Sequence, residues 1–216
     1  MFRITITPEF KLNKTLNIYC LHGILTFRGK KPLQPLYPYL SDISNVYSVN
    51  YGPRAVLTSA LLNRRTARQL ARQLVPPYIL IGHSNGCAII SRIVDLLSTE
   101  PEQSPAGLIL IHPALNSAWR PPAETWGLVY WNPKDLPVRA AKCLEWWPLS
   151  KCHRWGGMGV TGIDNNNALN ITGINTMMYS DTFIGHGVVQ SNPEFWGPRL
   201  ANHINGTFNF LRDTNG

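Results

Sequence analysis

The stretch best suited to chemistry is residues 78–90, YILIGHSNGCAII, in which one serine stands between two glycines inside an apolar run. Gly82, Ser84 and Gly86 form the pattern G-x-S-x-G. A strand that turns sharply into a helix forces its turning residue into a strained backbone conformation, and flanking glycines avoid clashes there. The turn raises the hydroxyl above the sheet. We therefore predict that Ser84 is a nucleophile; the alternative interpretation is a structural turn serine.

A serine hydroxyl becomes a good nucleophile only when a base removes its proton and a third group orients that base. The sequence contains six histidines. His186, in IGHGVV, lies between two glycines in a loop after the last predicted strand, where an imidazole can reach over the sheet edge, so we predict that it is the base. The other histidines are His22, His83, His112, His153 and His203.

The third group should be a carboxylate near the carboxyl end of a strand. Asp135 follows the apolar run GLVYWNP and is the predicted acid. Asp181 is the next choice, although it lies so near His186 in the chain that it can simply shape the same loop. Asp164 sits in the polar run IDNNNA and is more typical of a surface turn.

Attack on a carbonyl creates an oxyanion, which needs N–H donors. The first amides of the helix after Ser84 point at the same place, so we predict a donor at the backbone N–H of Asn85. A second donor is expected from the loop at 21–25, at Ile24 or a neighbour. Gly23 and His22 belong to the same predicted oxyanion and substrate-binding loop, in which His22 is expected to support the loop by hydrogen bonding and not to take part in the chemistry.

Strand-like and helix-like runs alternate along the chain, which predicts βαβ units and a mostly parallel sheet. The predicted strands are 15–23, 45–52, 78–82, 106–115, 125–135 and 170–180, and the predicted helices are 59–75, 85–98 and 193–211, the last interrupted early by Pro198. In such sheets the active site gathers at the carboxyl ends of the strands.

The elbow at Ser84, an aspartate after a later strand and then a histidine follow the order Ser, Asp, His. Over roughly residues 15–190 the chain resembles the α/β-hydrolase superfamily, in particular esterase- and lipase-like serine hydrolases. The resemblance implies an α/β fold with a doubly wound, mostly parallel sheet flanked by helices and a minimal cap. It also implies a triad of Ser84, Asp135 and His186 that needs no cofactor and no metal. The sequence departs from the family in lacking a glycine run such as HGGG at residues 21–25.

Length and composition predict one folded domain over 1–216, because 44% of the residues are hydrophobic and only 15% are charged. A Trp- and Gly-rich insert is expected at about 136–163. The N-terminal residues show no signal-peptide pattern, and no apolar run reaches the roughly 18 residues of a transmembrane helix. We therefore expect a cytoplasmic protein without a transmembrane segment.

The formal net charge of +8 is concentrated at 59–75, where Ala67, Leu70, Ala71 and Leu74 recur at helical spacing and Arg64, Arg65, Arg68 and Arg72 occupy other faces. The simplest interpretation is the solvated face of an amphipathic helix. The alternative is contact with an anionic surface such as nucleic acid, lipid or an acidic polymer, without specific recognition of nucleic acid.

Two patterns that suggest a cofactor or a metal are rejected. GMGVTG at 157–162 matches G-x-G-x-x-G but has neither a strand before it nor a helix opening within it, so we interpret it as a flexible loop. Cys143 and Cys152 are close enough in sequence to form a disulfide. Cys152 and His153 lack the further ligands of a zinc site.

The predicted reaction is hydrolysis of a carboxylic ester, with a small or surface-presented substrate because the chain is too short for a large cap. Of the seven tryptophans, all but Trp196 lie between 119 and 155, where they either wall an acyl pocket or pack the insert onto the sheet. Thioesterase, amidase and acyltransferase activities fit the same triad. A non-catalytic module that binds an anionic partner through 59–75 is the alternative from another class.

Overall fold

The computed structural model describes residues 4–11, 14–23, 32–51, 56–143, 155–163, 171–180 and 185–214. Its centre is a seven-stranded sheet in the order β1-β3-β2-β4-β5-β6-β7. The strands are β1 (Thr5–Phe10), β2 (Asn17–Leu21), β3 (Asn45–Asn50), β4 (Tyr78–His83), β5 (Gly107–Ile111), β6 (Trp126–Trp131) and β7 (Ile171–Asn175). All neighbouring pairs are parallel except β1 with β3. The mostly parallel sheet expected from the sequence is therefore confirmed.

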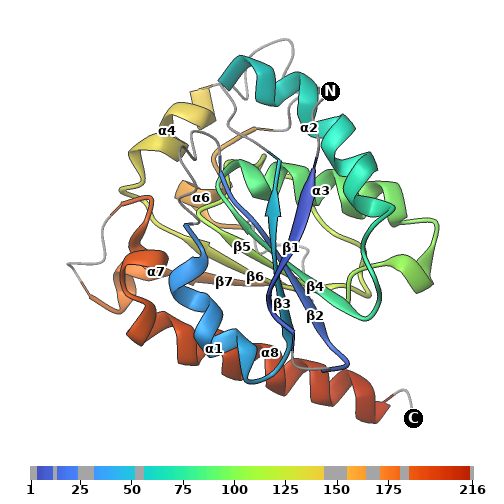
Figure 1. The fold of residues 1–216 in the computed structure, drawn as a ribbon. Coiled ribbons are helices and arrows are strands. Elements are labelled where there is room, and N and C mark those ends of the chain that lie inside the picture. Colours follow the sequence, from blue (N-terminus) through green and yellow to red (C-terminus); the bar gives the residue numbers. More distant parts are fainter. Residues whose placement is uncertain are drawn as a thin grey trace.

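Helices cover both faces of this sheet (Figure 1). They are α1 (Tyr37–Ser41), α2 (Val56–Ala71), α3 (Asn85–Leu97), α4 (Leu136–Cys143), α6 (Met158–Thr161), α7 (Val188–Ser191) and α8 (Pro193–Thr214), with 3-10 turns η1 (Gln34–Leu36), η2 (Pro101–Gln103) and η5 (Thr176–Met178). Helices α2 and α3 pack on one face, and α1, α7 and α8 pack on the other.

The alternation of side chains along β2 shows how the two faces are filled. Tyr19 and Leu21 belong to the core under α2 and α3, whereas Ile18 and Cys20 belong to the core under α1 and α8. A parallel strand that is buried on both faces needs apolar residues at every position, not at alternate ones. This requirement explains the continuous apolar run of β4, whose residues are all buried.

Several expected boundaries are corrected. The strand predicted at 125–135 ends at Trp131, and a helix, α4, begins at Leu136 inside the expected insert. The sequence 157–162 is not a flexible loop, because α6 forms there and Met158 is fully buried. Helix α8 runs on through Pro198. The edge strand β1 was not predicted at all.

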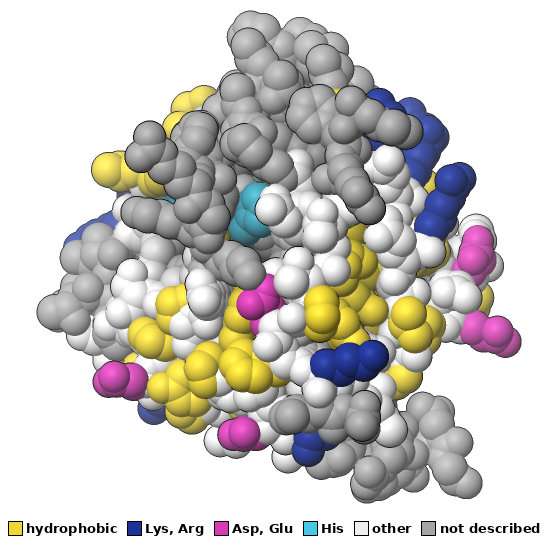
Figure 2. Space-filling model, viewed as in Figure 1, with side chains coloured by type: hydrophobic (Ala, Val, Ile, Leu, Met, Phe, Trp, Pro, Cys, Tyr) yellow, Lys and Arg dark blue, Asp and Glu magenta, His cyan; other side chains and the backbone are white. Residues whose placement is uncertain are grey.

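The basic segment folds as the amphipathic helix that its spacing indicates, although α2 ends at Ala71 and not at residue 75. Ala67 and Leu70 are fully buried, whereas Arg64 and Arg68 are exposed. Figure 2 shows Lys and Arg side chains gathered over this helix. Within the described ranges, no helix combines the length and hydrophobicity that crossing a membrane requires.

Candidate active site

Ser84 occupies the junction between β4 and α3 in a conformation that L-residues rarely adopt, with φ 55° and ψ −120°. A residue held in such a conformation costs about 1–3 kcal/mol, so the surrounding structure must impose it. Its N–H donates to the carbonyl of Ile111 (3.0 Å), and its carbonyl accepts from the N–H of Cys87 (3.1 Å). The backbone of the elbow is thereby fixed to the end of β5 and to the first turn of α3.

The elbow requires glycine at positions 82 and 86, because neighbouring atoms lie too close to leave room for a Cβ atom. A Cβ atom on Gly82 would lie 2.7 Å from Cδ1 of Ile90 and 3.0 Å from the backbone nitrogen of Cys87. A Cβ atom on Gly86 would lie 2.5 Å from the carbonyl oxygen of Leu21. Any side chain at either position would therefore push α3 away from the sheet and disturb the turn that carries the serine.

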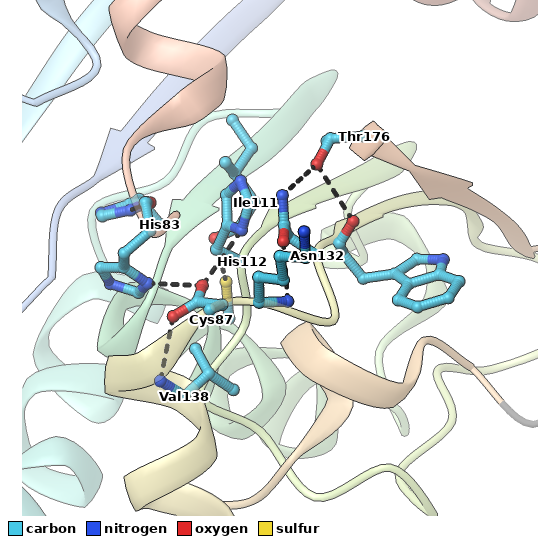
Figure 3. A network of polar contacts seen from close by, with 11 residues as sticks. His83, Cys87, Ile111, His112, Asn132, Val138 and Thr176 are labelled. Atoms are coloured by element: carbon cyan, nitrogen blue, oxygen red, sulfur yellow. Dashed lines mark hydrogen bonds and ion pairs between the residues drawn. The ribbon is translucent and has the colours of Figure 1, made fainter. Parts of the chain in front are cut away.

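Asp135 is fully buried immediately before α4 and uses both of its carboxylate oxygens. Oδ1 accepts the N–H of Val138 (3.0 Å), which is the bond of a helix N-cap. Oδ2 lies 2.8 Å from Nδ1 of His186 and 3.1 Å from Nδ1 of His112 (Figure 3). Two histidines from distant parts of the chain therefore meet at one carboxylate oxygen.

The surroundings of Asp135 keep it ionised. Burial alone would raise the pKa of this carboxyl, but hydrogen bonding to His112 and His186, together with the Val138 N–H, outweighs burial and holds the pKa well below its usual range. A carboxylate can only accept hydrogen bonds. The proton shared with His186 therefore belongs to Nδ1 of the imidazole, and in a neutral ring with this proton the lone pair is on Nε2.

His186 lies in the turn before α7, and its side chain is 23% exposed. The preceding Gly185 has φ 101°, a backbone conformation that favours glycine. The carbonyl of His186 accepts a hydrogen bond from Nε2 of His83 (3.0 Å), and the two rings are 4.6 Å apart. His83 therefore joins the elbow, one residue before Ser84, to the loop that carries the histidine.

The two buried histidines of this cluster are neutral. Burial lowers the pKa of His112, and burial followed by the neighbouring His186 ring lowers the pKa of His83 well below its usual value. Because these rings are uncharged, they surround His186 without strong repulsion. The site therefore combines the anionic carboxylate of Asp135 with the neutral imidazoles of His83 and His112.

The predicted oxyanion donors belong to the side of the elbow where the start of α3 and the end of β2 lie. The side chain of Asn85 is buried, and its Oδ1 accepts from Nδ2 of Asn63 and Nε1 of Trp155, both at 2.8 Å. The first amides of a helix have no partner within it, which is the basis of the predicted donor role of the Asn85 backbone N–H. A Cβ on Gly23 would lie 3.0 Å from Cβ of Ser84, so this loop lies against the serine.

The first two residues after β2, His22 and Gly23, lie against Tyr51, which belongs to none of the sequence motifs. The Tyr51 hydroxyl donates to the carbonyl of His22, and the two rings stack with centroids 4.1 Å apart. Nδ1 of His22 also lies 2.7 Å from the carbonyl oxygen of Gly23. His22 thus lies in a supporting position, and Ile24 falls outside the described residues.

The structure brings Asp135 and His186 into contact and places His83 and Gly23 beside the elbow. Asp164, Asp181 and His153 fall outside the described residues, and His203 lies exposed on α8. The contact of His112 with the carboxylate was not predicted; the strand expected at 106–115 ends at Ile111, and His112 follows it. Over the described part of the chain, no three His, Cys, Asp or Glu side chains are placed to hold a metal ion.

No protein-family model matches the sequence, and no curated protein matches it. Solved structures do resemble it. Carboxylesterase CesB of Bacillus subtilis is 12% identical, with 95% of this chain and 88% of that one covered and a TM-score of 0.56. Naproxen esterase, also from Bacillus subtilis, is 11% identical, with 94% and 88% covered and a TM-score of 0.56. The type II thioesterase BorB of the borrelidin biosynthetic cluster is 14% identical, with 93% and 96% covered and a TM-score of 0.53. The chain therefore has the α/β-hydrolase fold.

Proposed function

We propose that this chain is a serine hydrolase that cleaves carboxylic esters or thioesters through an acyl-enzyme. Ser84 is the nucleophile, His186 the base and Asp135 the group that orients the base. One observation carries the proposal. The strained elbow of Ser84 is joined through His83 to the backbone of His186, and the ring of His186 is bonded at 2.8 Å to a fully buried carboxylate.

In the first half-reaction the Oγ of Ser84 attacks the acyl carbon while Nε2 of His186 removes its proton. Asp135 accepts the Nδ1–H and stabilises the imidazolium that forms. The tetrahedral oxyanion is bound by the backbone N–H of Asn85 and by an N–H of the loop after β2, with Ile24 as the proposed residue. When the C–O or C–S bond breaks, the imidazolium returns the proton to the leaving alcohol or thiol.

In the second half-reaction a water molecule gives its proton to Nε2 of His186 and attacks the acyl carbon of the Ser84 ester. The same donors bind the second oxyanion, and collapse of this intermediate returns the proton to Oγ and releases the carboxylic acid. Asp135 stays ionised throughout, which agrees with the lowered pKa of its carboxyl. The cycle needs only the side chains and amides named here.

Esters are the first substrate class to test and thioesters the second, since solved structures with both kinds of name share the fold. The two classes share an acyl carbon that is open to attack and differ in the leaving atom. A small or surface-presented substrate remains our proposal.

A fluorophosphonate probe, which reacts with activated serines, tests the proposal directly. Wild-type chain and Ser84→Ala should be incubated with the probe, and the labelled peptide identified by mass spectrometry. Label on Ser84 that is lost in the variant supports the function, and parallel p-nitrophenyl ester and acyl-thioester series then rank the two substrate classes.

A folded wild-type chain that takes no label would contradict the proposal. It would favour the non-catalytic module, whose test is salt-dependent binding of an anionic polymer. Neutralising Arg64, Arg68 and Arg72 would abolish that binding, and Ser84→Ala would leave it unchanged.

A further inference from the structure

His112 is placed as if it belonged to the catalytic machinery, yet it is completely enclosed. Its side chain is 0% exposed, and its backbone has φ 46°; with Ser84 it is one of two non-glycine residues at positive φ in the described chain. Its N–H donates to the carbonyl of Tyr130 (2.8 Å). A Cβ on Gly159 would lie 2.8 Å from the carbonyl carbon of His112, so α6 packs directly on this backbone.

The position of His112 in the sheet explains what its ring can reach. Strand β5 lies between β4, which ends one residue before Ser84, and β6, which leads to Asp135. His112 is the first residue after β5. Its ring therefore stands between the strand that carries the serine and the strand that carries the acid, and its Nδ1 lies 3.1 Å from Oδ2 of Asp135 (Figure 3).

Two roles are excluded by this geometry. His112 cannot replace His186 as the base, because a base must reach the substrate's leaving group and His112 has no exposed surface, whereas His186 is 23% exposed. Simple apolar packing is also a poor account. Apolar packing alone does not explain why a ring nitrogen of His112 lies 3.1 Å from a buried carboxylate oxygen. It also does not explain the positive φ of this residue.

We propose that His112 is a positioning residue for the base and acts through Asp135, on whose Oδ2 it and His186 converge. The inference rests on the proposed hydrolase function. The Val138 N–H donates to Oδ1, His186 is bonded to Oδ2 and Nδ1 of His112 lies 3.1 Å from the same oxygen, so groups from separate segments surround the carboxylate. The donor from His112 also takes up part of the negative charge on the oxygen that His186 uses.

Removing that donor therefore has two effects on the reaction. The carboxylate gains freedom to rotate, which lowers kcat. The charge on Oδ2 then acts on the His186 ring alone and favours its protonated form, so the acid limb of the kcat/KM profile moves to higher pH. The titratable groups that face the carboxylate among the described residues are His83 from β4, His112 and His186.

The matched variants are His112→Asn and His112→Leu. Asparagine tolerates positive φ, and its Nδ2 can replace the Nδ1 donor, whereas leucine fills the space without donating. For leucine we expect kcat to fall about tenfold and the acid limb to move to higher pH. In the asparagine variant, kcat should lie within about threefold of the wild-type value, and the acid limb should return to its wild-type position. If leucine fails to fold, His112→Gly removes the donor without backbone strain.

A second measurement is independent of activity. Nitrogen-15 spectra of labelled histidine report the tautomer of each ring, and the proposal requires the neutral Nδ1–H form at His112. The Nε2–H form at His112, or leucine and glycine variants with an unmoved pH profile, would overturn it. If the wild-type chain does not react with the fluorophosphonate, the proposed hydrolase function is refuted, and so is a role for His112 in positioning a base. An Nδ1–H signal at His112 would then show only a structural contact with Asp135.

Discussion

Asp135→Asn separates the proposed orienting role of this residue from its role in stability. The substitution keeps size and shape, and the amide oxygen can still accept the N–H of Val138 at Oδ1. At Oδ2 the new NH₂ group is a donor, so the Nδ1 atoms of His186 and His112 must accept. Both rings must therefore change to the Nε2–H tautomer. His186 would then present a proton to Ser84, and it could no longer remove one.

The expected magnitudes follow from these contacts. A wrong imidazole tautomer lowers kcat of a Ser-His-Asp triad by about 10⁴, and we expect a loss of that order. All three contacts of the side chain can be kept, but the Nε2–H that His112 gains is buried without a hydrogen-bond partner among the described residues, so the free energy of unfolding should fall by about 1–3 kcal/mol. Asp135→Ala is the matched contrast. It removes the cap of α4, worth about 1 kcal/mol, and leaves the buried His112 donor unpaired, at a further cost of about 1–3 kcal/mol.

Both variants should be measured by urea unfolding at pH 7 and by hydrolysis of a p-nitrophenyl ester. We expect both variants to be inactive, with the asparagine variant about 1–3 kcal/mol and the alanine variant about 2–4 kcal/mol less stable than the wild type; the difference of about 1 kcal/mol between them is the lost cap of α4. An asparagine variant with kcat within tenfold of the wild type would refute the tautomer argument. An alanine variant as stable as the wild type would show that the carboxylate contacts contribute little to the fold.

Three further outcomes are expected. Ser84→Gly should be about 1 kcal/mol more stable than Ser84→Ala in urea, because glycine adopts φ 55° without strain; the reverse order would argue against a strained elbow. Gly86→Ala should lower the melting temperature at a cost of about 1–3 kcal/mol, since its Cβ meets the backbone of β2, and an unchanged melting temperature would contradict this packing. Burial lowers the pKa of His83 and His112, so below about pH 6.5 the unfolded chain binds more protons than the folded one. The free energy of unfolding should therefore fall with decreasing pH by up to about 1.4 kcal/mol per unit for each histidine, which urea titrations from pH 7 to 5 can follow in wild type and His112→Asn.

The parts of the fold that could be predicted are those with local signals. The elbow at Ser84 combines a glycine requirement on either side with an apolar strand before it and an apolar helix after it, and all of these lie within 13 residues of sequence, 78–90. The end of β6 was harder to locate. Asn132, whose Oδ1 accepts the N–H of Lys134 (2.9 Å), makes a turn there, so the chain leaves the sheet before Asp135 and then enters a helix.

Features that depend on contacts between distant residues could not be predicted. GMGVTG is rich in glycine, yet its backbone is ordered by bonds to another segment, from Met158 N–H to the Leu115 carbonyl and from Gly159 N–H to the Pro113 carbonyl, both 2.9 Å. His112 contacts the carboxylate of Asp135, which lies 23 positions later in the sequence. A single sequence shows only a polar residue after a buried strand. Periodicity contains no information about which distant side chain that residue meets.

The strain in this site is concentrated where two neighbouring strands end. Ser84 and His112, the two non-glycine residues at positive φ in the described chain, follow β4 and β5, which are paired in parallel register. The Ser84 N–H donates to the Ile111 carbonyl, and the Ala114 N–H donates to the Ser84 carbonyl (3.3 Å), so each turn helps to hold the other. A backbone conformation that costs energy persists only when its surroundings leave no alternative. The adjacent turns meet this condition together, because relaxing either one would break hydrogen bonds that hold the other. The serine and the histidine that contacts the acid are therefore expected to keep their positions as one unit, which is the rigidity that a preorganised hydrolytic site requires.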